Sequence, residues 1–300
     1  MRPGLPPDAP TVSVLLRTAA SALAGIGAGN PYLEAEYLLA RAWPCDRTSL
    51  LRRSPREVVA DDISRRWREL LDRRLTREPL QYVLGGTPFC ELDLLVGPGV
   101  LIPRSETETL VDLVFREIRI MDVPPGLLVD VGTGSGAILL ALLRRLPGWT
   151  GLGSDLSPAA LAWADRNRRA CGSKERAHLL RCDLTAAVRG GSAQVVVSNP
   201  PYIATSEMEL LQPEIRLHEP WLALDGGGDG LVIARRVVRD ARRLLRDGGL
   251  LAMELAAEHP PLLSPELQRA GFVRWESRAD LAGRMRFLLA WLPGRPGHPA

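Results

Sequence analysis

The chain has 300 residues, 46% of them hydrophobic, so it can bury a sizeable core and has room for two domains. Its formal net charge of +3 results from 38 basic and 35 acidic residues, and all but one of the basic residues are arginines. This balance excludes a strongly basic nucleic-acid groove as the main feature of the chain, although it is compatible with an acidic partner.

The cysteines and the termini indicate a cytoplasmic protein. The four cysteines form no C-x-x-C pair and the four histidines are scattered, so neither a disulfide framework nor a metal site is expected. The amino terminus lacks the apolar segment of a signal peptide, and no apolar run approaches about 18 residues, so we expect no membrane contact. Residues 1–10 and 294–300 are predicted to be disordered tails.

The first part of the chain has a helical pattern. Apolar residues recur at helical spacing in three segments, at 11–27, 32–42 and 59–71. We therefore predict a small helical domain over residues 11–80. Its stretch from Arg47 to Glu78 contains ten arginines and six acidic residues, which favours a solvated helical face over an RNA-facing patch.

A change of pattern follows this domain. Residues 81–104 alternate apolar with polar side chains and include Gly97-Pro98-Gly99, which predicts a β-hairpin that links two domains.

Residues 105–293 have the pattern of an α/β domain. Short apolar runs that end in polar residues alternate with helical segments, and these runs lie at 127–132, 151–156, 179–184, 195–200 and 250–255. The alternation predicts a mostly parallel sheet, which a closing pair of strands at 272–280 and 286–292 extends. Because ligands of such sheets bind at the carboxyl ends of the strands, the polar strand ends are the candidate site.

A glycine-rich loop, DVGTGSG (130–136), follows the first strand of this series and opens a helix. Its glycines let the backbone approach a ligand closely, but Gly132, Gly134 and Ala137 also satisfy the pattern of dinucleotide enzymes. Asp155 ends the next strand, where its carboxylate can accept hydrogen bonds from both ribose hydroxyls of an adenosine. Asp183 ends the third strand and can accept the adenine amino group; taken singly, either aspartate can also be a helix-capping turn residue.

The fourth strand stops at Asn199-Pro200-Pro201-Tyr202. The two prolines make this stretch nearly rigid, which suits either a strand terminator or a preorganised hydrogen-bonding site. In the second interpretation the Asn199 side-chain carbonyl and the Pro200 backbone carbonyl are two neutral acceptors that grip the N–H bonds of an amide or exocyclic amino group. Tyr202 supplies a flat wall against that planar group, or a packing contact.

Together these motifs resemble the class I S-adenosylmethionine (AdoMet) methyltransferases that act on planar nitrogens, whereas NAD enzymes have no such fourth-strand motif. Three further stretches resemble the HemK/PrmC family of protein-(glutamine-N5) methyltransferases: 74–89 (RLTREPLQYVLGGTPF), 100–112 (VLIPRSETETLVD) and 219–231 (EPWLALDGGGDGL). The resemblance implies a Rossmann-like, seven-stranded, mostly parallel sheet and a helical substrate-recognition domain. It also implies methylation of the glutamine in the Gly-Gly-Gln motif of peptide-chain release factors.

The same resemblance implies the site residues. AdoMet is the expected cofactor, and its expected binding residues are Arg104, Thr107, Asp130, Gly132, Thr133, Gly134, Gly136, Asp155, Leu156, Asp183, Leu184 and Asn199. The expected catalytic residues are Asn199, Pro200, Pro201 and Tyr202. Phe89 is expected to line the passage to the acceptor, with Asn199, Pro200 and Tyr202 contacting the substrate.

Two departures from the family pattern bear on the acceptor. Ser105 stands where the family has a proline, and Glu254 is followed by Leu255-Ala256-Ala257-Glu258-His259, without the family's glycine and glutamine. A small-molecule tailoring enzyme is therefore an alternative, and a nucleic-acid amino-methyltransferase is another. The second is disfavoured by the near-neutral charge, so no stable nucleic-acid partner is expected. A non-catalytic AdoMet-binding module is disfavoured by the complete 199–202 motif.

Overall fold

The computed structural model describes residues 10–294, so the two predicted tails lie almost entirely outside the described residues. The chain divides into two compact units. Unit 1 contains residues 10–85 and 212–218, and unit 2 contains residues 86–211 and 219–294.

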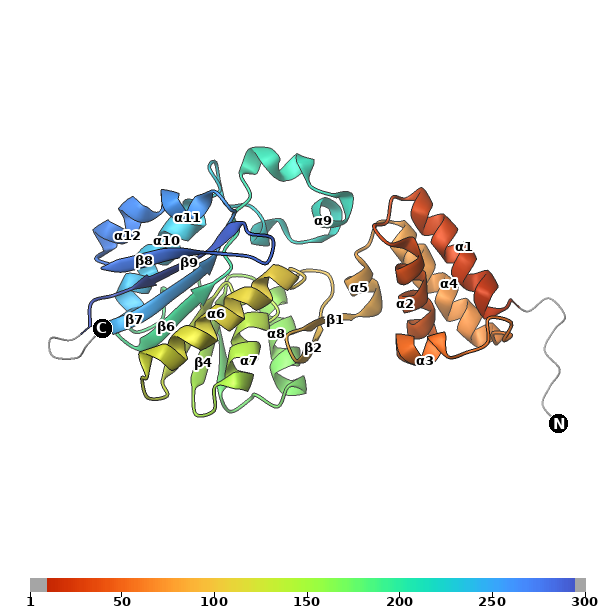
Figure 1. The fold of residues 1–300 in the computed structure, drawn as a ribbon, viewed down its shortest axis with the longest axis horizontal. Helices are drawn as coiled ribbons and strands as arrows, with labels where there is room; N and C mark the ends of the chain where they lie inside the picture. The colour runs from red at the N-terminus through yellow and green to blue at the C-terminus, as the bar shows by residue number, and fades with distance from the viewer. Residues whose placement is uncertain (1–9, 295–300) are drawn as a thin grey trace. The chain divides into compact units, whose positions relative to one another are not determined.

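Unit 1 is helical, as the apolar spacing predicts (Figure 1). Its helices are α1 (Val12–Gly25), α2 (Pro31–Ala42), α3 (Arg47–Leu51), α4 (Asp61–Leu75), α5 (Leu80–Leu84) and α9 (Pro213–His218). Side-chain caps begin two of them: Asn30 accepts the Leu33 N–H at 3.2 Å, and Asp46 accepts the Ser49 N–H at 2.7 Å. The apolar faces of α1, α2 and α4 form one buried cluster around Leu23 and Trp67.

The arginine-rich stretch is largely paired with acids. Exposed or half-exposed arginines contact carboxylates in the pairs Arg47–Glu36, Arg53–Glu57, Arg66–Asp62 and Arg73–Glu78. The exposure of these arginines supports the prediction of a solvated helical face, and the ion pairs are a further finding.

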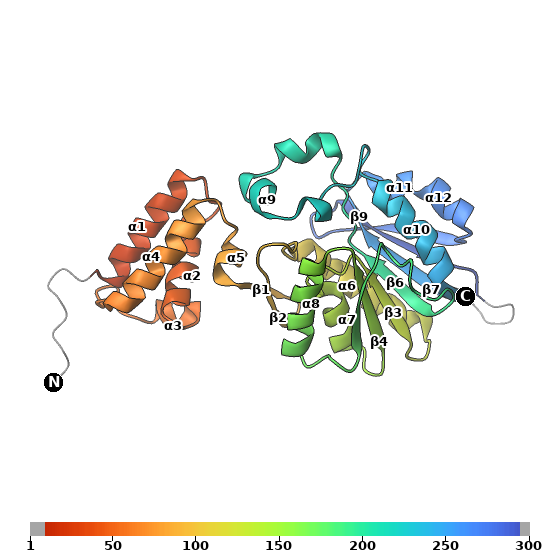
Figure 2. The same ribbon diagram turned by 180° about the vertical axis from the view of Figure 1, so that it is seen from behind.

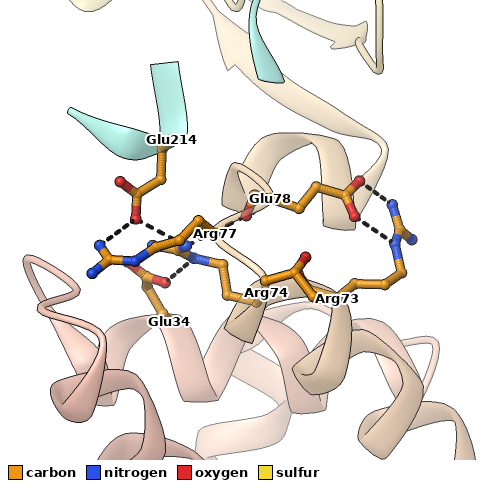
Figure 3. A network of polar contacts seen from close by, with 7 residues as sticks. Glu34, Arg73, Arg74, Arg77, Glu78 and Glu214 are labelled. Carbon is orange, nitrogen blue, oxygen red and sulfur yellow. Dashed lines mark hydrogen bonds and ion pairs between the residues drawn. The ribbon is translucent and has the colours of Figure 1, made fainter. Parts of the chain in front are cut away.

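A second group of ion pairs attaches α9 to the other helices of unit 1 (Figure 3). Arg74, whose side chain is 5% exposed, donates to Glu34 at 2.8 Å and to Glu214 at 3.2 Å. Arg77 also donates to Glu214, at 3.3 Å. α9 has no buried residue, so we expect these charged contacts to contribute much of its attachment. The boundary predicted for the helical domain misses this segment, which lies more than a hundred residues further along the chain.

The predicted hairpin is present but shorter than expected. Its strands are β1 (Gly86–Phe89) and β2 (Leu92–Leu95), which pair antiparallel with Phe89 opposite Leu92. The residues just before it form α5 instead, and Gly85 ends that helix with a φ of +79°, a conformation that favours glycine.

Unit 2 contains the predicted seven-stranded sheet, in the order β5-β4-β3-β6-β7-β9-β8. Its strands are β3 (Leu127–Val131), β4 (Thr150–Asp155), β5 (Ala177–Arg181), β6 (Ala193–Ser198), β7 (Leu245–Glu254), β8 (Arg274–Ala279) and β9 (Met285–Trp291). The first five run parallel, and β9 pairs antiparallel with both β7 and β8. The strand order reverses between β3 and β6, which is where a sheet of this type has its ligand crevice.

Helices cover both faces of the sheet (Figures 1 and 2). The longer helices on these faces are α6 (Ser105–Met121), α7 (Ala137–Arg145), α8 (Pro158–Ala170) and α10 (Val232–Leu244). The other helices of unit 2 are shorter: α11 (His259–Leu262), α12 (Ser264–Ala270), η1 (Thr205–Leu210) and η2 (Trp221–Ala223). Leu128 packs with α6 and α7 on one face, and its neighbour Val129 packs with α10 and α12 on the other. This alternation explains why the strands are apolar throughout. Among residues 10–294, no helix is long and apolar enough to cross a membrane.

Candidate cofactor and acceptor site

A pocket of about 250 Å³ opens at the carboxyl ends of the central strands of unit 2. It contains most of the residues that the motifs predict, and those lining it are Arg104, Thr107, Gly132, Thr133, Gly134, Asp155, Leu156, Asp183, Leu184, Asn199, Pro200 and Pro201. The glycine loop after β3, the ends of β4 and β5 and the 199–201 stretch after β6 therefore meet at one place.

The glycine loop has a backbone that only glycine adopts easily. Gly132 and Gly134 have φ values of +72° and +57°. A Cβ on Gly132 would meet no atom within 4 Å, so nothing in the protein crowds this backbone. The N–H groups of Gly132 and Thr133 both donate to the Ser154 carbonyl at 2.9 Å, which fixes the loop to β4.

Two residues predicted to contact the cofactor lie beneath the loop rather than in the pocket. Asp130 is fully buried and accepts the Thr133 hydroxyl at 2.7 Å; burial raises the pKa of its carboxyl to about 7. Gly136 precedes α7 with a φ of +82°, and a Cβ there would lie 3.3 Å from Leu140. In this structure both residues shape the loop, and their expected contact with the cofactor stays a prediction.

Asp155 lies at the pocket wall with its carboxylate held by the backbone. The Gly134 N–H donates to one oxygen at 2.9 Å and the Ser157 N–H donates to the other at 2.8 Å. Burial raises the pKa of this carboxyl, while those two N–H groups oppose the rise. Each oxygen keeps a further lone pair, so the carboxylate is oriented for a pair of hydroxyl donors.

We expect Asp155→Ala to weaken AdoMet binding by about 1.5–3 kcal/mol, the range for hydrogen bonds to a charged group. Isothermal titration calorimetry measures the change. Asp165→Ala is the matched control, because Asp165 lies on α8 and pairs with Arg168 and Arg169 at the surface. An Asp155→Ala affinity equal to that of the control would rule out this placement of the ribose.

Asp183 has a partner that its motif does not reveal. Arg236 of α10 donates to its carboxylate at 2.7 Å, and both residues line the pocket. The following residue, Leu184, has a φ of +49°, an uncommon conformation for a branched side chain. Backbone strain of this kind is found at functional sites, and Leu184 is one of the residues that line the pocket.

Arg104 is held by the 219–231 stretch. Glu219, whose side chain is 1% exposed, accepts a hydrogen bond from the Arg104 guanidinium and, at 3.2 Å, one from the Ile102 N–H. Two motifs more than a hundred residues apart thus form one wall of the pocket.

Asn199 also lines the pocket, and its side-chain N–H donates to the Thr107 hydroxyl at 3.2 Å. Glycines support the backbone after it. A Cβ on Gly226 would lie 2.8 Å from the Pro201 carbonyl, and one on Gly230 would lie 2.5 Å from the Tyr202 carbonyl. The glycines of the 219–231 stretch are therefore required by close packing against the 199–202 motif.

Two residues predicted to contact substrate lie outside the pocket. Phe89 is 1% exposed in the apolar core, and its expected contact with the substrate stays a prediction. Tyr202 is partly buried beside Glu254, and burial, with a smaller contribution from that carboxyl, raises the pKa of its hydroxyl to about 12. It is therefore a neutral group at physiological pH.

Several pocket residues lack any sequence signal that we recognised. They include Val100 and Leu101 before α6, Pro220 and Leu222 in the 219–231 stretch, and Arg236 of α10. The first four lie inside stretches that carry the family resemblance, which could have identified them. Arg236 lies on a helix rich in arginines, where nothing marks one of them as special.

The residues present fit AdoMet. A glycine loop with an uncrowded backbone, an oriented carboxylate at the end of β4 and apolar walls match the ribose and adenine of a nucleoside.

Comparison with known proteins agrees with this site. Residues 14–85 match the model of the PrmC N-terminal domain, and residues 117–264 match that of the Methyltransferase small domain. The release factor glutamine methyltransferase of Moorella thermoacetica is 40% identical over 94% of this chain and 98% of its own length. That of Gloeobacter violaceus is 40% identical over 87% of this chain and 91% of its own length.

Among solved structures, the human METTL16 catalytic domain aligns with a TM-score of 0.55 and 16% identity, covering 77% of this chain and 84% of that one. At this identity it shows the fold alone, a class I methyltransferase sheet. The identity to the curated relatives over nearly the whole chain shows the family. The chain belongs to the HemK/PrmC family of release factor glutamine methyltransferases and is an AdoMet-dependent methyltransferase.

Proposed function

We propose that this protein transfers the AdoMet methyl group to the side-chain amide nitrogen of the glutamine in the Gly-Gly-Gln motif of a peptide-chain release factor. The observation that carries the proposal is the position of Asn199 and Pro200 at the wall of the same pocket that contains Asp155 and the glycine loop. Since release factors act in translation, the proposal also places the enzyme in the cytoplasm.

Asn199 and Pro200 can assist the attack of a weakly nucleophilic amide nitrogen. An amide nitrogen is a weak nucleophile because its lone pair is delocalised, whereas AdoMet supplies a methyl group on a good leaving group. The Asn199 side-chain carbonyl and the Pro200 backbone carbonyl can accept the two amide N–H bonds, which orients the nitrogen and favours the positive charge that it gains.

Methyl transfer needs no general base before the nitrogen attacks. The carbon–sulfur bond breaks as the carbon–nitrogen bond forms, and the nitrogen then loses one proton to water. Neither carbonyl acceptor titrates, so Asn199 and Pro200 impose no pH dependence of their own.

The test is to incubate the full-length protein with AdoMet and the release factors of its own organism, then map the modified peptide by mass spectrometry. We expect one methyl group on the glutamine of the Gly-Gly-Gln peptide. A release factor with that glutamine replaced by alanine is the matched control and should stay unmodified. No methyl on the glutamine, under conditions where a known family member adds one, would favour a small-molecule acceptor.

A further inference from the structure

Residues 183–188, the segment after β5, carry the predicted adenine contact at the edge of the sheet. β5 is the edge strand, so it pairs with β4 alone. Asp183 lines the pocket with a side chain that is 53% exposed. A half-exposed carboxylate turns freely about its side-chain bonds unless a partner holds it, and that freedom is lost when a ligand binds.

Helix α10 fixes the backbone of this segment. Asp240 accepts the Thr185 N–H at 3.2 Å and the Thr185 hydroxyl at 2.6 Å. Arg243 donates to the Thr185 carbonyl at 2.6 Å and to the Val188 carbonyl at 2.5 Å. Because Thr185 is fully buried, these contacts attach the segment firmly to the helix.

Arg236 extends the same set of contacts to the pocket. Arg236, Asp240 and Arg243 recur at spacings of four and three residues, so they lie along one face of α10. The Arg236 guanidinium donates to Oδ2 of Asp183 at 2.7 Å, and both residues line the pocket. Within residues 10–294 no other hydrogen bond reaches the Asp183 side chain, so Oδ1 keeps its full capacity to accept.

The two oxygens of Asp183 therefore differ in what they can bind. Oδ2 is engaged by Arg236, and Oδ1 is left for a donor in the pocket. An ionised carboxylate can only accept, and the amino group of adenine supplies N–H donors. We propose that Arg236 is a positioning residue for the cofactor, which holds the Asp183 carboxylate so that Oδ1 accepts the adenine amino group of AdoMet.

The ion pair also lowers the cost of covering this carboxylate. A base in the pocket shields Asp183 from water, and an ionised carboxylate loses hydration when it is shielded. The guanidinium of Arg236 replaces part of that hydration with a charge-assisted hydrogen bond. Since the Arg236 side chain is itself 39% exposed, water screens the pair and its effect on affinity is modest.

This inference depends on AdoMet as the methyl donor and on the predicted position of its adenine at Asp183. It does not depend on which acceptor is methylated. The binding experiment below and the release-factor experiment above can therefore fail independently.

The experiment measures the affinity of the full-length protein for two ligands by isothermal titration calorimetry. One is S-adenosylhomocysteine, which AdoMet becomes after methyl transfer, and the other is its 6-deamino analogue, which has purine in place of adenine. In Arg236→Met we expect Kd for S-adenosylhomocysteine to rise about fivefold, the upper end for an exposed ion pair. Kd for the analogue should change less than about twofold, because the analogue has no amino group for Oδ1 to accept.

Arg239→Met is the matched control. Arg239 lies on the same helix, is exposed, donates to the Arg235 carbonyl at 3.3 Å, and is not among the residues that line the pocket. It should keep the wild-type Kd for both ligands. Asp183→Ala should weaken binding of S-adenosylhomocysteine, and in that background Arg236→Met should have no further effect, since a positioning residue needs the group that it positions.

The analogue separates positioning from a general structural role. Its unchanged affinity in Arg236→Met would show that the variant folds and keeps its pocket. If Arg236→Met weakened both ligands equally, or neither, the positioning role would be overturned. An Asp183→Ala variant with wild-type affinity for S-adenosylhomocysteine would overturn it as well, because the adenine would then lie elsewhere. If the expected affinities were found but the release factor stayed unmethylated, the proposed function would fail and the positioning role would stand.

Discussion

Asn199→Ala is expected to lower kcat for methyl transfer by about a hundredfold or more and to leave AdoMet affinity within about twofold. The variant removes one of two neutral acceptors that orient the amide nitrogen, and their effect is greatest in the transition state, where that nitrogen becomes positive. The cofactor keeps Asp155 and the glycine loop, which are separate from Asn199 in the pocket. Single-turnover kinetics with saturating AdoMet, together with calorimetry, measure the two quantities.

Asn30→Ala is a suitable control for this prediction. Asn30 caps α2 in unit 1, so its loss should reduce stability by about 1 kcal/mol without changing kcat. If Asn199→Ala instead lost AdoMet binding and kept its rate per bound cofactor, Asn199 would be a cofactor residue. The mechanism through two carbonyl acceptors would then be wrong.

The sheet and the pocket could be predicted from the sequence because their signals are local. Each parallel strand is a short apolar run with a polar residue at its carboxyl end, and the topology alone brings Asp155, Asp183 and Asn199 to one edge. The glycine loop is equally local, since Gly132 and Gly134 have backbone conformations that few other residues adopt.

Contacts between distant residues could not be predicted in this way. Nothing in the sequence pairs Glu219 with Arg104, or selects Arg236 among the arginines of α10 as the partner of Asp183. Phe89 is a related case. A phenylalanine in a family motif is equally compatible with a substrate wall and a core, and its 1% exposure in the core cluster is not visible in the sequence.

The attachment of helix α9 also depends on contacts between residues that are distant in the sequence. Arg74 is central to them, because it contacts both Glu34 and Glu214 (Figure 3). We expect Arg74→Met to destabilise unit 1 by about 3 kcal/mol, the low end of the range for removing one partner of a buried ion pair. The low end applies because the Glu34 and Glu214 side chains, at 14% and 18% exposure, keep some access to water.

Acid should release α9 in the wild-type protein as well. Burial alone would raise the pKa of Glu214, but hydrogen bonds from its own backbone, Arg74 and Arg77 hold the pKa below the ordinary value of 4.5. A lowered pKa in the folded state stabilises the fold above the unfolded value of 4.5, and this stabilisation is lost as the pH falls through the folded value. Protonation then removes the charge that both arginines bind.

Hydrogen exchange of the full-length protein tests the Arg74 prediction, because it reports on each unit separately where a single unfolding free energy would not. In Arg74→Met we expect the amides of α2 and α4 to lose protection and those of β3 and β6 to keep it.

Arg66→Ala is the control; it removes an exposed ion pair from the same helix and should cost at most about 1 kcal/mol of stability. The triple variant Glu34→Met, Arg74→Met, Glu214→Met should regain much of the loss, since no charge is left unpaired in a buried place. If Arg74→Met cost no more than Arg66→Ala, the ion pairs would not be what holds α9 in unit 1.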